Sequence, residues 1–406
     1  MQQRLVIIGA GFAGMYAALS AARLREMNGV SAEQLEIALV SPEPTLVVRP
    51  RLYEPRPETL TAPLGDVLKA IDVVFVKGLV ETIDTKGRSM EIVTGVNGTR
   101  KTRTLDYDRL IVATGSRLFR PPVPGLAEHG FSVDDLDDAI KLDRHLQGLA
   151  GKPASKARNT VVVAGAGFTG IEAATEMPAR LRSVLGNDAA IRVIMVERND
   201  TIAPDMGVDA RPVIEKALRD LGIETRVGTG VASLDKSGVT LSNGERIESE
   251  TVIWAAGIRA APLTAQIPAP RDNLGRLLVD SDLRVSTVPG VFATGDAAKA
   301  ASDDIGNFAL MSCQHATRLG AFAGNNAAAE LLGQPTRRYH QKTYVTCLDL
   351  GEAGAVFTRG WDRKVEVVGA DAKKLKQEIN TVWIYPPPAE RAAALASADP
   401  ERVTDL

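Results

Sequence analysis

Two glycine-rich motifs constrain this chain more than any other feature of its sequence. Each has the form G-x-G-x-x-G, follows a short apolar run (5–8 or 161–164) and precedes an Ala-rich stretch. The first glycine permits a tight turn, the second lets a phosphate approach the backbone, and the third lets a helix pack against the sheet. The helix N-terminus then offers unpaired N–H groups to an anion. We therefore expect dinucleotide contacts at Gly9, Gly11, Phe12, Ala13, Gly14, Gly165, Gly167, Phe168, Thr169 and Gly170.

The sequence around the two motifs repeats on the scale of a whole domain. Each half continues with a helix, a second strand, a hairpin marked by Asn-Gly, and a buried strand that ends in glycine. This order predicts two α/β units with doubly wound sheets. The expected elements are helices over 15–23 and 171–185, strands over 35–40 and 192–196, an apolar loop over 46–53, turns at Asn97-Gly98 and Asn243-Gly244, and closing segments 107–115 and 251–257.

Composition narrows the class of protein. The chain has 406 residues, of which 45% are hydrophobic and 24% charged, and its net charge is −2, so no large field favours nucleic acid or an anionic membrane. Its two cysteines, Cys313 and Cys347, are too few for a disulfide framework or a metal site of their own. No apolar run reaches the roughly 18 residues of a membrane span, and the first strand leaves no room for a signal peptide. We expect a cytoplasmic protein without a metal.

The second strand of each unit ends where a cofactor ribose is expected. Glu197 follows that strand in the second unit, and its carboxylate fits a ribose 2′-hydroxyl, which favours NADH over NADPH. The alternative is a solvated charge at a strand end. In the first unit this place holds Ser41, with Glu43 two residues on. Ser41 is either a ribose contact or a simple turn residue.

Several segments resemble two-dinucleotide flavoprotein reductases, and type II NADH:quinone oxidoreductases in particular. They are 49–54 (RPRLYE), 167–172 (GFTGIE), 252–260 (VIWAAGIRA) and 295–298 (GDAA). The resemblance implies FAD in the first unit, NAD(H) in the second, and Asp296 on the ribityl chain of the flavin. Further cofactor contacts implied or expected are Arg49, Ala113, Thr114, Gly115, Ala256, Gly257, Gly295, Gln314, His315 and Ala316.

The same resemblance implies how the domains are connected. The chain is expected to return to the FAD domain after the NAD domain, so that the NAD domain is inserted. We expect an FAD domain over 1–118 and 267–335, an NAD(H) domain over 119–266, and a small α+β C-terminal region over 336–406.

Three residues are candidates for catalysis: Glu172, Gln314 and His315. Glu172 matches a family glutamate beside the nicotinamide and flavin, where burial would raise its pKa and let it deliver a proton to a quinone. Its alternative role is a first-turn helix acid. Ser312 is expected to cap a helix that lines the acceptor site, where the family reads A-Q-x-A-x-Q. Here Gln314 and Ala316 match, but Cys313 and Arg318 depart from it. His315 lies inside this signature and has either a chemical or a structural role.

The remaining features leave alternatives open. The cysteines are either buried apolar residues or redox groups. A helix over 371–385, with Leu375, Ile379, Val382 and Trp383 on one face and lysines nearby, either binds a membrane surface or packs on the protein or on a partner subunit of a homodimer. Packing is favoured, so a peripheral place at the membrane is the weaker alternative.

The expected function is transfer of a hydride from NADH to FAD and of two electrons to a quinone or quinone-like small molecule. The rivals are a reductase of a protein carrier of the rubredoxin or ferredoxin type, a flavin-binding sensor with little turnover, and thiol chemistry at the cysteines.

Overall fold

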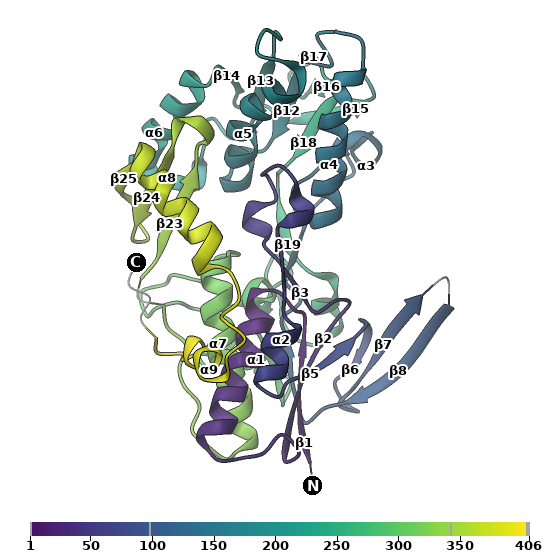
Figure 1. The fold of residues 1–406 in the computed structure, drawn as a ribbon, viewed down its shortest axis with the longest axis vertical. Helices are drawn as coiled ribbons and strands as arrows, with labels where there is room; N and C mark the ends of the chain where they lie inside the picture. The colour runs from purple at the N-terminus through teal and green to yellow at the C-terminus, as the bar shows by residue number, and fades with distance from the viewer. Residues whose placement is uncertain (1, 97–98, 342, 403–406) are drawn as a thin grey trace.

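Two parallel five-stranded sheets organise the chain, one in each of two lobes (Figure 1). The computed structural model describes residues 2–96, 99–341 and 343–402. The lower lobe of Figure 1 carries the first glycine motif and the upper lobe the second, while the C-terminal segment runs along one side of both. The expected α/β fold with two doubly wound units is confirmed.

The first sheet has the strand order β21-β9-β1-β2-β5, all parallel. Side chains alternate across it, as the pleat requires. Leu5 and Ile7 face helices α1 and α7 (Cys313–Leu331), whereas Val6 and Ile8 face the antiparallel sheet β6-β7-β8. Both faces are covered, which explains the continuous apolar run in β1. The elements are β1 (Gln3–Ile8), α1 (Phe12–Met27), β2 (Leu35–Ser41), β3 (Thr45–Val47), β4 (Thr61–Pro63), α2 (Gly65–Ala70), β5 (Val74–Lys77), β6 (Leu79–Asp84), β7 (Ser89–Val96), β8 (Thr99–Asp106), β9 (Arg109–Val112) and β10 (Ser116–Leu118).

The second sheet, β11-β18-β12-β13-β14, repeats this plan. Val161 and Val163 of β12 face helices α4, α5 and α6, whereas Val162 and Ala164 face the antiparallel sheet β15-β16-β17. The match in strand order and in covering layers confirms the duplication. The elements are α3 (Leu126–His129), β11 (Gly130–Phe131), α4 (Leu136–Gly148), β12 (Thr160–Ala164), α5 (Phe168–Leu185), β13 (Arg192–Val196), α6 (Gly207–Asp220), β14 (Ile223–Arg226), β15 (Val231–Asp235), β16 (Gly238–Leu241), β17 (Arg246–Glu248), β18 (Thr251–Trp254) and β19 (Ile258–Ala260).

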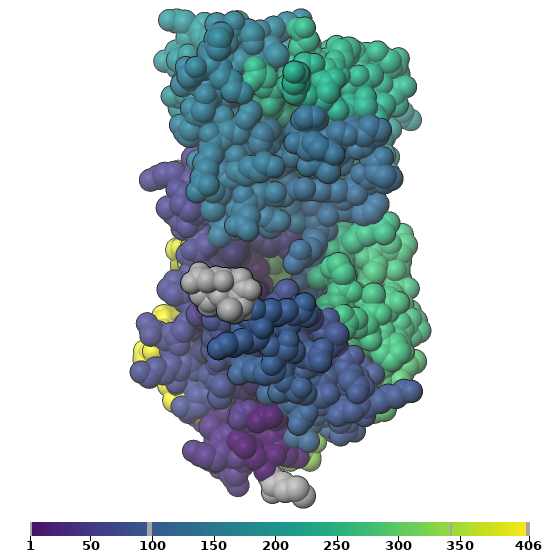
Figure 2. Space-filling view, turned by 90° about the vertical axis from the view of Figure 1, so that its right-hand side faces the viewer, coloured from purple at the N-terminus to yellow at the C-terminus, as the bar shows by residue number. Residues whose placement is uncertain are grey.

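The two sheets differ in the origin of their fifth strand. The second takes β11, which precedes it in sequence, whereas the first takes β21 (Val291–Ala293), which follows the whole second sheet. The second sheet is therefore inserted within the first unit. Figure 2 shows the lobes one above the other, with the returning segment, in green, beside the lower lobe. The expected boundaries at 118, 266 and 335 stay predictions. The returning elements are β20 (Leu277–Leu278), β21, β22 (Ala298–Lys299) and α7 (Cys313–Leu331).

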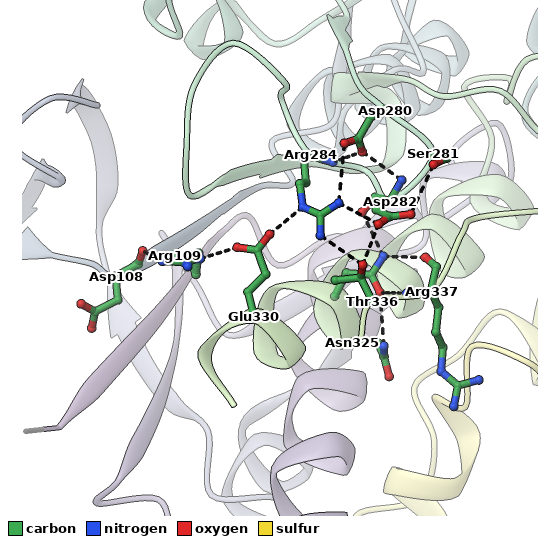
Figure 3. A network of polar contacts seen from close by, with 11 residues as sticks. Asp108, Arg109, Asp280, Ser281, Asp282, Arg284, Asn325, Glu330, Thr336 and Arg337 are labelled. Atoms are coloured by element: carbon green, nitrogen blue, oxygen red, sulfur yellow. Dashed lines mark hydrogen bonds and ion pairs between the residues drawn. The ribbon is translucent and has the colours of Figure 1, made fainter. Parts of the chain in front are cut away.

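Ion pairs fasten the returning segment to the first unit (Figure 3). Glu330, at the end of α7, lies 2.5 Å from Nε of Arg109 in β9 and 2.6 Å from Nε of Arg284. Arg284 also pairs with Asp282 at 2.7 Å. In the first half of α7 the helix lies against α1 so closely that a Cβ at Gly320 would overlap the carbonyl oxygen of Ala13.

The C-terminal region is the small α+β unit that the sequence predicts. Strands β23 (Val345–Asp349), β24 (Ala355–Arg359) and β25 (Lys364–Val368) form an antiparallel sheet that packs against α8 (Gly369–Glu378), and α9 (Arg391–Ser397) packs on α1. Leu375 and Ile379 pack into this unit, although Val382 is exposed. The α8 helix thus packs on the protein, the favoured alternative. Among the described residues, no helix has the length and apolar character to cross a bilayer.

A few local expectations need correction. Helices α1 and α5 begin directly after the second glycine of each motif, three residues earlier than expected. The segment over 46–53 is not simply a loop, because it contributes β3 and a short 3-10 turn at Arg49–Arg51. The turn at Asn243-Gly244 joins β16 to β17 as predicted, whereas Asn97-Gly98 lies outside the described residues.

Candidate functional site

The two glycine motifs have the same geometry. Gly9 and Gly165 adopt φ of +109° and +107°, a region that favours glycine. A Cβ on Gly14 would overlap the carbonyl oxygen of Gly9, and one on Gly170 would overlap that of Gly165. The first glycines therefore serve the turn and the third glycines serve helix packing, as the motif predicts.

The second glycine of each motif is different, because it faces open space. A Cβ on Gly11 or Gly167 would meet no atom within 4 Å. Each is the N-cap of its helix, without a side-chain cap and without an acidic residue in the first turn. The N–H groups and the dipole at both helix ends are thus available to an anion. Phe12 and Ala13, like Phe168 and Thr169, lie in these first turns.

Four polar residues gather beside the first motif. Arg49 binds Asp134 at 2.7 Å and lies 4.0 Å from Asp296, and the Ser116 hydroxyl donates to Asp296 at 2.5 Å. Burial raises the pKa of Asp296, although Ser116 and Arg49 counteract this effect. The cluster joins three distant segments of the chain. Sequence reasoning anticipated Arg49 and Asp296 but missed Asp134 and Ser116, which have no motif of their own.

The edge of the first sheet also carries unsatisfied polar atoms. The hydroxyls of Thr114 and Thr294 are buried and have no hydrogen-bond partner in the described protein. Thr114 lies in the expected Ala113-Thr114-Gly115 segment, whereas Thr294 directly precedes Gly295. A Cβ on Gly295 would crowd Ala13 at 2.7 Å, so this segment lies against the first motif. Because orphaned buried hydroxyls are costly, the site fits a ligand with many polar groups, such as FAD.

Helix α7 begins as predicted, with Ser312 as its N-cap. The imidazole of His315 is fully buried, with Nδ1 2.9 Å from the Ser312 hydroxyl and Nε2 without a partner in the described protein. Its ring lies 5.2 Å from that of Tyr344. Burial lowers the pKa of His315 to about 4, so the ring is neutral near pH 7. A neutral imidazole can donate a hydrogen bond but cannot act as an imidazolium acid. The oxygen of Gln314 accepts from the Val345 N–H at 3.5 Å.

Ala316 and Arg318 complete the signature at the start of α7 and have different surroundings. Ala316 is buried near Gly295. Arg318 donates to the carbonyl oxygens of His340 at 2.9 Å and Arg402 at 3.0 Å, so it holds the C-terminal segment. The change from glutamine to arginine at this position therefore has a structural reason.

Glu172 forms a buried ion pair with Lys376. Lys376 Nζ lies 2.7 Å from Glu172 Oε1, and the two side chains are only 6% and 4% exposed. Glu172 belongs to the second turn of α5, so the alternative role as a first-turn acid is wrong. Burial raises its pKa to about 7, although Lys376 counteracts this. Burial alone would lower the pKa of Lys376, but Glu172 outweighs it and the pKa is raised.

Lys376 was not predicted as a site residue. The sequence groups it with Lys373 and Lys374 beside an apolar face, which suggested a membrane surface. Only Lys374 is largely exposed, because Lys373 and Lys376 point inward to carboxylates. The Lys376 ammonium also lies 5.5 Å from the ring of Phe168 in the second motif.

The ribose edges of the two units differ. Glu197 is buried, and its carboxylate accepts from the N–H groups of Ala166 at 2.8 Å and Asn199 at 2.9 Å. The alternative of a solvated charge is therefore wrong. In the first unit Ser41 is the last residue of β2, and Glu43 forms an exposed ion pair with Lys77 at 2.6 Å.

The segment that closes the second unit lies beside the linker between the units. The indole N–H of Trp254 donates to the carbonyl of Ala256 at 2.9 Å. Gly257 has a φ of +87° and lies against Phe119. Ala255 and Ala256 approach Gly165, as Ala113 approaches Gly9.

Both cysteines are free. Burial raises the pKa of the Cys313 thiol and raises that of Cys347 to about 12, so both remain protonated near neutral pH. A protonated thiol is a poor nucleophile, and Cys347 is buried while Cys313 is partly buried. This favours their interpretation as apolar packing residues.

Comparisons with known proteins agree with this geometry. The family model described as pyridine nucleotide-disulphide oxidoreductase matches residues 3–320. A protein of Mycobacterium tuberculosis named NADH dehydrogenase-like is 48% identical over 98% of both chains. Demethylphylloquinone reductase of Synechocystis is 29% identical over 87% of this chain and 86% of its own.

Two further matches are more distant in sequence. A type II NADH:quinone oxidoreductase of Staphylococcus saprophyticus is 24% identical over 95% of this chain and 96% of its own. The structure of NDH2 from Plasmodium falciparum in complex with NADH has a TM-score of 0.79, at 14% identity and with 98% of each chain covered, and so has the same fold. These matches confirm the predicted resemblance.

Proposed function

The chain belongs to the pyridine nucleotide-disulphide oxidoreductase family, and on this premise we propose that it oxidises NADH and passes two electrons to a quinone or quinone-like small molecule. Its class is that of an NADH dehydrogenase-like flavoprotein oxidoreductase. Support for a quinone comes from the relatives named as quinone reductases.

The observation that carries the proposal is the Glu172–Lys376 pair. A buried carboxyl group with a pKa of about 7 can both hold and release a proton near neutral pH. A quinone needs protons as well as electrons when it is reduced to a quinol. Lys376 lies beside Phe168 of the second motif, and its charge also acts on Cys313 at the start of α7. Glu172 thus supplies protons where the nucleotide unit meets the acceptor helix.

The first unit supplies the flavin site. FAD, when bound, provides the chemistry that links a two-electron donor to the acceptor. The N-terminus of α1 at Gly11 would receive its pyrophosphate. Arg49, Ser116 and Asp296 would hold the hydroxyls of its ribityl chain, and Thr114 and Thr294 would gain partners. The N-terminus of α7, at Gln314 and His315, would offer N–H groups that stabilise negative charge on the reduced flavin.

The second unit supplies the nucleotide site. The open N-terminus of α5 at Gly167 receives the pyrophosphate of NADH. Glu197 binds the adenosine ribose, and its carboxylate repels the extra phosphate of NADPH. Ala256 and Gly257 line the same edge of the sheet. The preference for NADH rests mainly on Glu197.

An anaerobic titration tests the function. The purified yellow protein is mixed with a slight excess of NADH, and a short-chain quinone is added after the flavin band has bleached. Bleaching followed by rapid return of the band is the expected result. Bleaching without return on quinone would contradict a quinone acceptor, and return on oxidised ferredoxin or rubredoxin would assign a protein carrier instead. Absence of bleaching would contradict the whole proposal.

A further inference from the structure

A second carboxylate lies next to Glu172 and is not used by the function proposed above. The Asp349 N–H donates to Glu172 Oε1 at 3.1 Å, so the main chain of β23 holds the carboxyl group of α5 in place. The Asp349 side chain is itself only 8% exposed. A buried carboxylate at this point requires donors of its own.

Those donors come from three different parts of the chain. Asp349 Oδ2 accepts from the Tyr53 hydroxyl at 3.1 Å, and Oδ1 accepts from the Gly351 N–H at 2.9 Å. Oδ1 also pairs with the Lys373 ammonium on α8. Tyr53 belongs to the RPRLYE segment, of which the proposed function uses Arg49 but not Tyr53. The ion pair of Asp349 and Lys373, with Tyr53, therefore joins the first unit, the C-terminal sheet and α8.

The two lysines of α8 face two different carboxylates. Lys373 pairs with Asp349, and Lys376, almost one turn later, pairs with Glu172. Residues three apart lie on the same face of a helix, so α8 presents both ammonium groups to the network together. The two ion pairs are linked through the Asp349 N–H and through the electric field between them.

We propose that Asp349 and Lys373 form a positioning pair that holds Glu172 in place and sets the charge around it. This inference rests on the proposed role of Glu172 as a proton donor. The Asp349 carboxylate disfavours a second negative charge on Glu172, and Lys373 compensates that effect. Asp349 and Lys373 need not touch the acceptor, because they act through Glu172.

Other groups also surround Glu172 and contribute to its environment. The titratable side chains are Lys376 and Lys373 of α8, Asp349 and Cys347 of β23, Tyr53 before β4, Glu176 one turn further along α5 and, through Lys376, Cys313 of α7. Tyr53 and both thiols have raised pKa values and stay neutral near pH 7. Burial and Asp349 raise the pKa of Glu176, whereas Lys373 counteracts this. Lys376 and Asp349 therefore act on Glu172 directly, and Lys373 acts on it through its ion pair with Asp349.

The direction in which the pKa of Glu172 shifts in each variant tests this proposal. Asp349→Asn removes a negative charge and leaves Lys373 positive, so Glu172 should titrate at lower pH. Lys373→Met leaves the Asp349 charge uncompensated, so Glu172 should titrate at higher pH. Shifts of about half to one pH unit in opposite directions are expected for charges at these separations. The double variant should return close to the wild-type midpoint.

The measurement is an infrared titration of the FAD-loaded protein. The carbonyl band of protonated Glu172 is assigned from its loss in Glu172→Gln, and its midpoint is followed with pH in each variant. Lys374→Met is the matched control, because Lys374 lies on the same helix but is largely exposed. The control should leave the midpoint unchanged.

The outcomes separate this inference from the proposed function. Opposite shifts support the positioning pair, whereas unchanged midpoints or shifts in one direction overturn it. If Asp349→Asn does not fold, the upward shift in Lys373→Met decides alone. The titration needs no electron acceptor, so failure of quinone to reoxidise the flavin would refute the function without affecting this result.

Discussion

Lys376 Nζ on α8 lies 2.7 Å from Glu172 Oε1 on α5, although one residue belongs to the C-terminal region and the other follows the second glycine motif. The pair is buried, so each charge depends on the other. The same helix was a candidate membrane anchor on its sequence alone. In the structure, it completes the site in which the proposed proton donor lies.

Glu172→Gln should separate the two half-reactions. An amide cannot deliver a proton, so transfer to quinone should slow by about 100-fold or more, while bleaching by NADH stays within a few-fold. In the wild type, the quinone step should slow as the pH rises through about 7, because Glu172 then loses its proton. Stopped-flow absorbance of the flavin band against pH measures both effects.

Glu215→Gln provides the matched control, since it makes the same change on α6, a different helix of the same unit. It should retain the pH dependence of the quinone step. An equal loss in both variants would show that Glu172 has no special role.

The role of the second glycine of each motif, Gly11 or Gly167, can be tested in variants that still fold. Gly11→Val adds a side chain in open space, so the protein should fold but lose FAD, because the branched side chain blocks the phosphate. Gly167→Val should retain FAD and raise the NADH concentration needed for half-maximal bleaching by at least tenfold. Flavin content after gel filtration and NADH titration check these results. A Gly11→Val protein with full FAD content would contradict the assignment of the first unit.

His315 should make the fold sensitive to acid. Its pKa falls from the ordinary 6.5 to about 4. Below pH 6.5 the unfolded chain therefore binds a proton that the folded chain does not take up until about pH 4. Stability is lost as the pH falls through this window, by up to about 3 kcal/mol.

His315→Gln should remove this contribution. Glu172 has a pKa raised from 4.5 to about 7, so its own contribution to stability is lost as the pH rises through this range. The informative quantity is therefore the difference in the free energy of unfolding between His315→Gln and wild type at each pH. Urea denaturation at pH 5 and at pH 7.5 measures it. An identical pH dependence in the two proteins would argue that His315 is not kept neutral.

Glu330 should matter for stability more than an ordinary surface acid. It bridges Arg109 and Arg284 and ties α7 to β9 of the first unit (Figure 3). Glu330→Gln leaves two partly buried guanidinium groups without their shared carboxylate, and we expect a loss of about 1 to 2 kcal/mol in the free energy of unfolding. Asp371→Asn, which breaks an exposed pair with Lys374, should change it by less than about 0.5 kcal/mol. Equal effects would contradict the role of the network.

The parts of this molecule that could be predicted from sequence are local in character. Gly9, Gly11 and Gly14 lie in one turn, so their spacing carries the geometry, and the apolar run before them predicts a buried strand. Ser312 caps α7 through a contact three residues away. Asp296 was found because the resemblance supplied its role.

The missed residues depend on tertiary contacts. Lys376, Asp134 and Ser116 each meet partners from distant segments, and no spacing in the sequence indicates such meetings. A lysine beside an apolar helix face fits a membrane surface and a buried carboxylate equally well. Only the packing of α8 on its own sheet distinguishes the two.

Deuterated NADH tests the central claim most directly, because the account requires the hydride to leave NADH before any electron reaches the quinone. With deuterium at the transferred position, the anaerobic bleaching of the flavin band should slow several-fold, and its return on quinone should keep the same rate. This result would establish two separate half-reactions. Quinone reduction without a bleaching phase, or an isotope effect confined to the return of the band, would contradict the account.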